Sequence, residues 1–315
     1  MSIRRVGIVW NPSKTSREDL QSAVDAVLPG DDVHWFETSE DDPGGEAAEL
    51  AVAAGAELVL AAGGDGTVRA VAERLASAEA EVDLGIVPLG TGNLLARNLG
   101  VPLDDIAGAV RRAAEGSVRS IDIGWAEVTL SESVEHHGFA VMAGFGIDAH
   151  MITETDDDLK DKAGWLAYVE SLGRAVSASE VIDIRLTEDG GEPVEERAHT
   201  LIVGNCGMLQ GGITLLPDAD PGDGELDVLM LHADGIAGWL DTMRNMVWDN
   251  GLKRLLRRDG DEARAESSDT ATHRRITALT IDLDRPRVFE VDGEDLGECT
   301  RVEIRVQPAA LRIRC

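Results

Sequence analysis

Two glycine-rich segments carry residue types that suit phosphate chemistry. The first, Gly63-Gly64-Asp65-Gly66-Thr67, follows an apolar run and precedes a helix-like stretch. Glycines let the backbone turn tightly, and their N–H groups together with a helix N-terminus form an anion site. A carboxylate among phosphates makes sense when it meets Mg²⁺ or orients a hydroxyl, because it would otherwise repel them. Asp65 is therefore a candidate catalytic residue.

The second segment, Gly90-Thr91-Gly92-Asn93, ends the next apolar run. Neighbouring parallel strands end at one edge of a sheet, where open α/β sheets bind ligands. Either segment alone is best read as a tight turn, whereas the pair indicates a nucleotide site. No G-x-x-x-x-G-K-[ST] occurs, and Leu95 stands where a dinucleotide fingerprint needs a small residue. A P-loop enzyme and a Rossmann dehydrogenase are both poor fits.

Carboxylates gather in two later segments. Asp292-Gly293-Glu294 lies between apolar runs, a pattern typical of a hairpin turn, and such a turn can also carry a catalytic carboxylate. Residues 217–227 hold five Asp or Glu residues and two glycines. Such a segment suits a hard cation bound through oxygen, with a solvated acidic turn as an equal alternative.

The apolar pattern predicts the elements that position these segments. Strands at 5–10, 33–37, 57–62 and 84–88 alternate with helices, which indicates βαβ units and a parallel sheet covered on both faces. Ser16 followed by Asp19 resembles a capping box that opens the first helix. Near residue 120 the pattern changes to a mostly antiparallel β domain. Its expected strands are 121–128, 138–143, 181–186, 199–203, 226–231 and 276–283, with one helix at 163–176.

The composition and net charge of the chain limit its expected partners and its expected cellular compartment. The 315-residue chain has a net charge of -30, which argues against nucleic acid as a partner because its phosphates would be repelled. No run approaches the ~20 apolar residues of a membrane-spanning helix, and the first residues lack the apolar core of a signal peptide. Three widely separated cysteines fit a reduced compartment. We expect a cytoplasmic protein, either monomer or homodimer.

Taken in order, the motifs resemble those of the bacterial diacylglycerol kinases and related lipid kinases, whose catalytic core is shared with sphingosine kinases. The resemblance covers nearly the whole chain. It implies an α/β N-terminal nucleotide-binding domain with a parallel sheet (1–120), followed by a β-sandwich-like domain (121–301), with residues 302–315 able to return to either. The segments that carry it are 9–13, 63–67, 89–97, 122–124, 143–148, 217–227 and 291–294.

The resemblance implies an ATP- and Mg²⁺-dependent kinase that phosphorylates a lipid hydroxyl, with diacylglycerol favoured, at a membrane surface to which it binds peripherally and reversibly. It makes Asp65, Asp292 and Glu294 catalytic and leaves open which of the last two is the base. It implies a structural Mg²⁺ at the Asp223 carboxylate and the backbone carbonyls of Asp220 and Glu225. The residues expected at the ATP site are Asn11, Pro12, Ser13, Lys14, Thr15, Thr38, Gly64, Asp65, Gly66, Thr67, Val68, Arg69, Ala70, Gly90, Thr91, Gly92 and Asn93.

The sequence differs from the family pattern at two positions, and two other functions are alternatives to a lipid kinase. Lys14 follows Ser13 where the family has glycine, and Leu94 stands where many relatives have aspartate. An NAD kinase-like enzyme and a non-catalytic nucleotide-binding regulator of the same fold are the alternatives. One cluster of basic residues either faces anionic lipid or pairs with nearby acids: Lys253, Arg254, Arg257, Arg258, Arg274 and Arg275.

Overall fold

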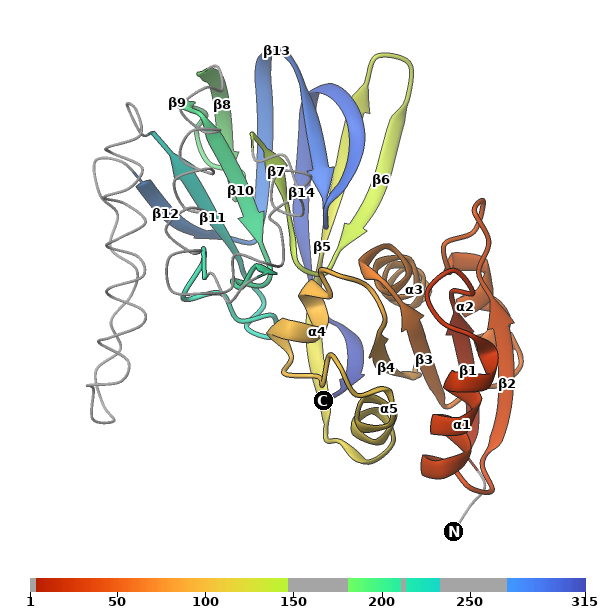
Figure 1. The fold of residues 1–315 in the computed structure, drawn as a ribbon. Helices are drawn as coiled ribbons and strands as arrows, with labels where there is room; N and C mark the ends of the chain where they lie inside the picture. Colours follow the sequence, from red (N-terminus) through yellow and green to blue (C-terminus); the bar gives the residue numbers. More distant parts are fainter. Residues whose placement is uncertain (1–3, 147–180, 211–213, 233–270) are drawn as a thin grey trace, which may run out of the picture.

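The structure is a computed structural model that describes residues 4–146, 181–210, 214–232 and 271–315 (Figure 1). The helix expected at 163–176 lies outside the described residues. The same holds for four members of the basic cluster, namely Lys253, Arg254, Arg257 and Arg258.

The N-terminal domain is built on a parallel sheet with strand order β2-β1-β3-β4. All residues of β3 and β4 are buried, as expected for parallel strands that are covered on both faces. The predicted parallel α/β arrangement is confirmed. The strands are β1 (Arg5–Trp10), β2 (Asp32–Glu37), β3 (Leu58–Gly63) and β4 (Asp83–Pro88).

Five helices connect and cover these strands, with α1 packed against α5 and α2 against α3 (Figure 1). Ser16 caps the first of them, since its hydroxyl accepts a hydrogen bond from the backbone N–H of Asp19 at 3.1 Å, as the capping-box pattern predicts. The helices are α1 (Arg17–Val27), α2 (Gly45–Ala53), α3 (Asp65–Ser77), α4 (Leu94–Asn98) and α5 (Ile106–Glu115).

The C-terminal part is β-rich, and its strands pair with one another only in antiparallel fashion within the described residues. The predicted antiparallel domain is therefore confirmed. The strands are β5 (Val118–Leu130), β6 (Val134–Phe139), β7 (Met142–Phe145), β8 (Ile182–Glu188), β9 (Val194–Ala198), β10 (Thr200–Gly204), β11 (Leu226–Leu231), β12 (Ala271–Ile276), β13 (Ala278–Val291) and β14 (Glu294–Arg314).

The last strand joins the two parts of the molecule. Strand β14 pairs antiparallel with β13 and β5, and its final residues pair in parallel with β4, at Arg312 opposite Asp83 and Ile313 opposite Leu84. The buried Asp83 carboxylate accepts hydrogen bonds from Arg312 at 2.8 Å and from Arg314 at 2.7 Å. One chain segment thus runs from the Asp292-Gly293 turn into the parallel sheet.

One expected strand is interrupted. The strand predicted at 138–143 is split into β6 and β7, because Ala140 and Val141 turn their N–H groups to the Asp292 carboxylate instead of a neighbouring strand. This prediction of a continuous strand was wrong, since the interruption comes from a side chain about 150 positions away in the sequence.

Candidate functional site

The residues predicted for a nucleotide site lie at the carboxyl ends of the four parallel strands. Asn11 to Thr15 follow β1, Thr38 follows β2, Gly64 to Ala70 follow β3, and Gly90 to Asn93 follow β4. Backbone hydrogen bonds tie these ends together: Asn11 N–H donates to the carbonyl of Ala62 at 2.9 Å, and Thr38 N–H to that of Trp10 at 3.0 Å. The predicted residues therefore share one edge of the sheet.

The two glycine loops pack directly against each other. A Cβ on Gly90 would lie 2.7 Å from the Cα of Gly64, a backbone atom that has no room to move. A Cβ on Gly64 would lie 3.8 Å from the Cε atom of Lys14, so the lysine side chain passes over the first loop. The amide of Asn93 closes the second loop, since it accepts from the N–H of Gly90 at 2.9 Å and donates to its carbonyl at 2.7 Å.

Asp65 joins these loops. Its carboxylate accepts hydrogen bonds from the backbone N–H groups of Asn93 at 2.8 Å and Leu94 at 2.6 Å, at the start of α4. An acceptor at a helix N-terminus satisfies N–H groups that have no partner within the helix. Asp65 therefore has a structural task as well as a position suited to chemistry. The residue types and spacing of the loops did not reveal this contact, because it joins two segments about 28 residues apart.

A cavity of about 290 Å³ lies where the glycine loops face the C-terminal domain. Asp65, Gly92 and Arg69 line it from the nucleotide side, and the 292–294 turn lines it from the other. The rest of its wall is mostly apolar. The apolar residues are Leu94, Met142, Ala143, Phe145, Ile202, Leu209 and Leu215. The sequence placed Leu94, Ala143 and Phe145 in family motifs, but it predicted none of the seven as a site residue.

The Asp292-Gly293 turn has the backbone expected of a tight hairpin, with positive φ angles of 47° and 85°. The Asp292 side chain is half-buried and accepts three hydrogen bonds, from the N–H groups of Ala140 at 2.8 Å, Val141 at 2.9 Å and Met142 at 2.9 Å. Burial raises the pKa of Asp292 to about 6, against the opposing effect of these N–H groups. Asp292 thus fastens the turn to the 140–142 segment.

Glu294 stands in a different environment. Its side chain is 53% exposed and forms an ion pair with Arg69 of α3. Both residues line the cavity. Of the two carboxylates that the sequence could not rank, Glu294 is therefore the more exposed and meets a side chain, while both oxygens of Asp292 accept hydrogen bonds from backbone N–H groups.

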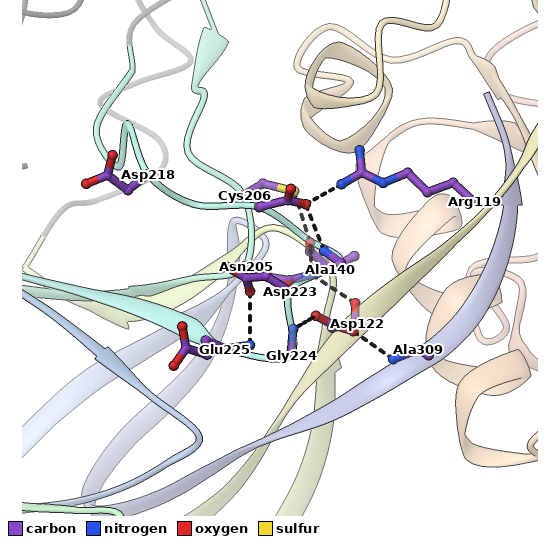
Figure 2. Close-up of polar contacts among 12 residues, drawn as sticks. Arg119, Asp122, Ala140, Asn205, Cys206, Asp218, Asp223, Gly224, Glu225 and Ala309 are labelled. Atoms are coloured by element: carbon purple, nitrogen blue, oxygen red, sulfur yellow. Dashed lines mark hydrogen bonds and ion pairs between the residues drawn. The ribbon is translucent and has the colours of Figure 1, made fainter. Parts of the chain in front are cut away.

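The acidic segment 217–227 forms a loop that leads into β11 at Leu226, and buried Asp122 holds this loop (Figure 2). The Asp122 carboxylate accepts from the N–H of Gly224 at 2.7 Å and from that of Ala309 at 2.7 Å. At the rim, Asp220 pairs with Arg119, and Asp223 accepts from the N–H of Glu225 at 3.0 Å. Sequence reasoning listed Asp122 only as part of a motif, because a buried anchor leaves no separate pattern.

The oxygen atoms of this loop are the candidate ligands of the expected Mg²⁺. Within the described ranges, no three Asp, Glu, His or Cys side chains converge as a metal cluster. The expected site needs only one carboxylate, that of Asp223, besides carbonyl oxygens, and Mg²⁺ commonly uses one or two carboxylates with water. The Asp223 carboxylate also lies 3.5 Å from Arg275. The donor set therefore fits a hard cation that would compete with one guanidinium.

Asp227, at the start of β11, lies close to several other acidic side chains of this segment. Burial raises the pKa of Asp227 to about 6, and the negative charges of Asp223, Asp218 and Glu225 add to this effect, whereas Arg275 opposes it. A nearby buried acceptor is also unsatisfied: the side-chain oxygen of Asn205 has no partner in the described part of the chain. The amide of Asn205 donates to the carbonyl of Asp122 at 2.9 Å, so it belongs to the network that holds the loop.

Two glycine loops at the carboxyl edge of a parallel sheet face a β-rich domain across a mostly apolar cavity. This arrangement is suited to a kinase. The chain matches the diacylglycerol kinase catalytic domain over residues 5–126 and the YegS C-terminal NAD kinase beta sandwich-like domain over residues 141–315. The chain therefore belongs to this lipid kinase family.

Individual relatives agree. The chain is 30% identical to "Probable lipid kinase YegS-like" of Pseudomonas aeruginosa, over 98% of this chain and 93% of the relative. It is 27% identical to a diacylglycerol kinase of Mycobacterium tuberculosis, over 84% and 78% of the two chains. The crystal structure of a diacylglycerol kinase from Bacillus anthracis has the same fold, with a TM-score of 0.69 and 21% identity over 100% of this chain and 97% of that one.

Proposed function

We propose that this kinase transfers the γ-phosphate of ATP to a lipid hydroxyl in the presence of Mg²⁺, with diacylglycerol as the favoured acceptor. The observation that carries the proposal is the cavity, in which an apolar wall meets the glycine loops on one side and Glu294 on the other. An apolar wall suits the acyl part of a lipid, and the loops suit the phosphates of the donor. The names of the relatives support the same class of acceptor.

The nucleotide would lie along the carboxyl edge of the parallel sheet, in contact with the loops after β1 to β4. The N–H groups of the first glycine loop and the N-terminus of α3 would face the phosphates, and Lys14 would add a positive charge there. Asp65 would keep the second loop in register with the first. Mg²⁺, when bound, would neutralise phosphate charge, and its structural site would be formed by Asp223 with the carbonyls of Asp220 and Glu225.

Glu294 would act as the general base that accepts the proton of the lipid hydroxyl. Both carboxylates of the turn line the cavity, but Glu294 is the more exposed, whereas the Asp292 oxygens are taken by three N–H groups. Asp292 would support catalysis indirectly, because it holds the 140–142 segment and the turn that carries Glu294. A base must be within hydrogen-bond reach of its proton before its basicity matters.

Binding to the membrane would be peripheral, and the protein itself cytoplasmic. No helix in the described ranges is long and apolar enough to cross a bilayer. Two members of the basic cluster are engaged with acids: Arg274 pairs with Glu188 and Glu196 at 2.5 Å, and Arg275 with Glu225 at 3.2 Å. For these two arginines the pairs support an ion-paired surface over lipid contact.

A transfer assay tests the proposal. The protein is incubated with γ-labelled ATP, Mg²⁺ and mixed micelles that contain, one at a time, diacylglycerol, a sphingoid base, a glycolipid or a polyprenol. A separate incubation contains NAD in place of the micelles. We expect label in phosphatidic acid formed from diacylglycerol, and none without Mg²⁺. Label in NADP instead of lipid would favour the NAD kinase-like alternative, and nucleotide binding without any transfer would favour a non-catalytic regulator.

A further inference from the structure

Arg69 is the positively charged side chain in the lining of the cavity, and it connects the two domains. It lies in the second turn of α3, directly behind the first glycine loop, yet only 8% of its side chain is exposed. One guanidinium nitrogen pairs with Glu294 at the start of β14, across the cavity. The other pairs with Glu73 one helical turn further along α3, at 3.0 Å.

Glu73 is itself held in place. It packs against β6, where a Cβ on Gly138 would lie 3.0 Å from the Glu73 Cγ atom. Burial raises the pKa of Glu73, and the Arg69 charge opposes this effect. The Arg69 Nε atom is buried and has no hydrogen-bond partner in the described residues, so the guanidinium orientation is fixed by its two carboxylate partners.

We propose that Arg69 is a positioning residue for phosphoryl transfer: it orients the Glu294 carboxylate towards the bound hydroxyl, and Glu73 in turn orients Arg69. This inference rests on the proposed function, in which Glu294 accepts the hydroxyl proton. It goes beyond it by assigning to Arg69 and Glu73 tasks that are separate from nucleotide contact.

The physical reason lies in the shape of the guanidinium. Its planar fork presents several N–H donors in fixed directions, so one Arg can bridge two carboxylates, whereas the single ammonium of Lys cannot reproduce that geometry. Glu294 is half-exposed, and without a partner its side chain would sample several rotamers. A misplacement of about 1 Å can cost roughly 10²-fold in rate.

The test measures kcat and KM for ATP for the Arg69→Ala, Arg69→Lys and Glu73→Gln variants. We expect Arg69→Ala to lower kcat about 10²-fold with little change in KM for ATP, and to recover part of its rate with added guanidinium ion. Arg69→Lys should lower kcat less, because it retains the charge. Glu73→Gln should lower kcat several-fold without moving KM for ATP.

Arg74→Ala is the matched control. It removes an arginine from the same helix that pairs with Glu49 and does not line the cavity, so kcat should stay unchanged. A rise in KM for ATP with unaltered kcat in both Arg69 variants would overturn the inference and make Arg69 a nucleotide ligand. Should Arg69→Ala fail to fold, Arg69→Lys decides by the same measurements. A wild type that transfers no phosphate would instead refute the proposed function itself.

Discussion

At the scale of single residues, three carboxylates at one cavity differ because of what surrounds them. Asp65 accepts two backbone N–H groups at the start of α4, and Asp292 accepts three from the 140–142 segment. Glu294 is half-exposed and meets a guanidinium. Residue type alone gives all three the same chemistry. Their hydrogen-bond partners distinguish them: Asp65 and Asp292 hold backbone segments in place, whereas Glu294 is the proposed acceptor of a substrate proton.

Asp65→Asn should weaken both nucleotide binding and transfer. The amide replaces one acceptor oxygen by a donor, so Asn93 or Leu94 loses its hydrogen bond and the second glycine loop loosens. A hydrogen bond to a charged group is worth about 1.5–3 kcal/mol, which predicts a loss of roughly 10- to 100-fold in kcat/KM for ATP. Steady-state kinetics measure this effect.

Asp105→Ala is its control, because Asp105 also accepts an N–H at a helix start, from Gly108 at 2.8 Å, but does not line the cavity. It should change stability and leave kcat/KM alone. Equal kinetics for wild type and Asp65→Asn would remove Asp65 from the site.

Glu294→Gln and Asp292→Asn should differ in what they damage. Glu294→Gln removes the proposed base at a half-exposed position, so kcat should fall by about 10²–10⁴-fold with little change in melting temperature. Asp292→Asn points a donor at one of three N–H groups, which should cost about 1–3 kcal/mol of stability besides activity. Kinetics together with thermal melts separate the two. The assignment would be reversed if Asp292→Asn lost activity at full stability while Glu294→Gln stayed active.

The pH dependence of stability gives an independent check on Asp292. Its pKa is about 6 in the folded protein and 3.8 in the reference state, so between these pH values the folded protein keeps a proton that the unfolded chain has released. Rising pH therefore favours unfolding, and the contribution that is complete below pH ~4 is lost as the pH passes 6. The stability advantage of wild type over Asp292→Asn should shrink by about 3 kcal/mol from pH 4 to pH 7.

Asp227, whose pKa is also raised to about 6, is present in both proteins and cancels in this difference. Urea unfolding at several pH values measures it. A difference that grew with pH would contradict a raised pKa for Asp292.

At the scale of helices and strands, the sequence predicted those features that a local pattern of residues encodes. Runs of apolar residues predicted β1, β3 and β4, and the Ser16–Asp19 capping pattern predicted the start of α1. The split between β6 and β7 was not predictable, because a carboxylate from the 292 turn causes it. The anchoring of the acidic loop by Asp122 escaped prediction for the same reason. Pairings between distant segments leave no periodic signal.

The acidic loop carries a prediction of its own. Mg²⁺ should raise the melting temperature of wild type but not of Asp223→Ala, because a ligand that binds only the folded state stabilises it. Glu225→Gln is the matched control: it removes a partner of Arg275 and keeps the backbone carbonyl of the expected site, so its response to Mg²⁺ should persist. The same Mg²⁺ response in Asp223→Ala would exclude a metal at this carboxylate.

At the scale of the whole molecule, β14 makes the arrangement of the domains part of the site. It begins at Glu294, beside the cavity, and ends against β4 of the nucleotide domain. A tilt of one domain against the other would therefore move Glu294, the proposed base, relative to the glycine loops. The net charge of -30 gives the protein no general attraction to anionic membranes. Recognition of the lipid should thus depend on the cavity more than on surface charge.

The proposed activity is the transfer of a γ-phosphate to a lipid hydroxyl at this cavity. Mass spectrometry of lipids after incubation with ATP that carries ¹⁸O in its γ-phosphate tests it most directly. The heavy phosphate should appear on diacylglycerol with the wild-type protein and Mg²⁺, and should be nearly absent with Glu294→Gln. Heavy inorganic phosphate without any heavy phospholipid, or equal amounts of labelled lipid from wild type and Glu294→Gln, would contradict the account.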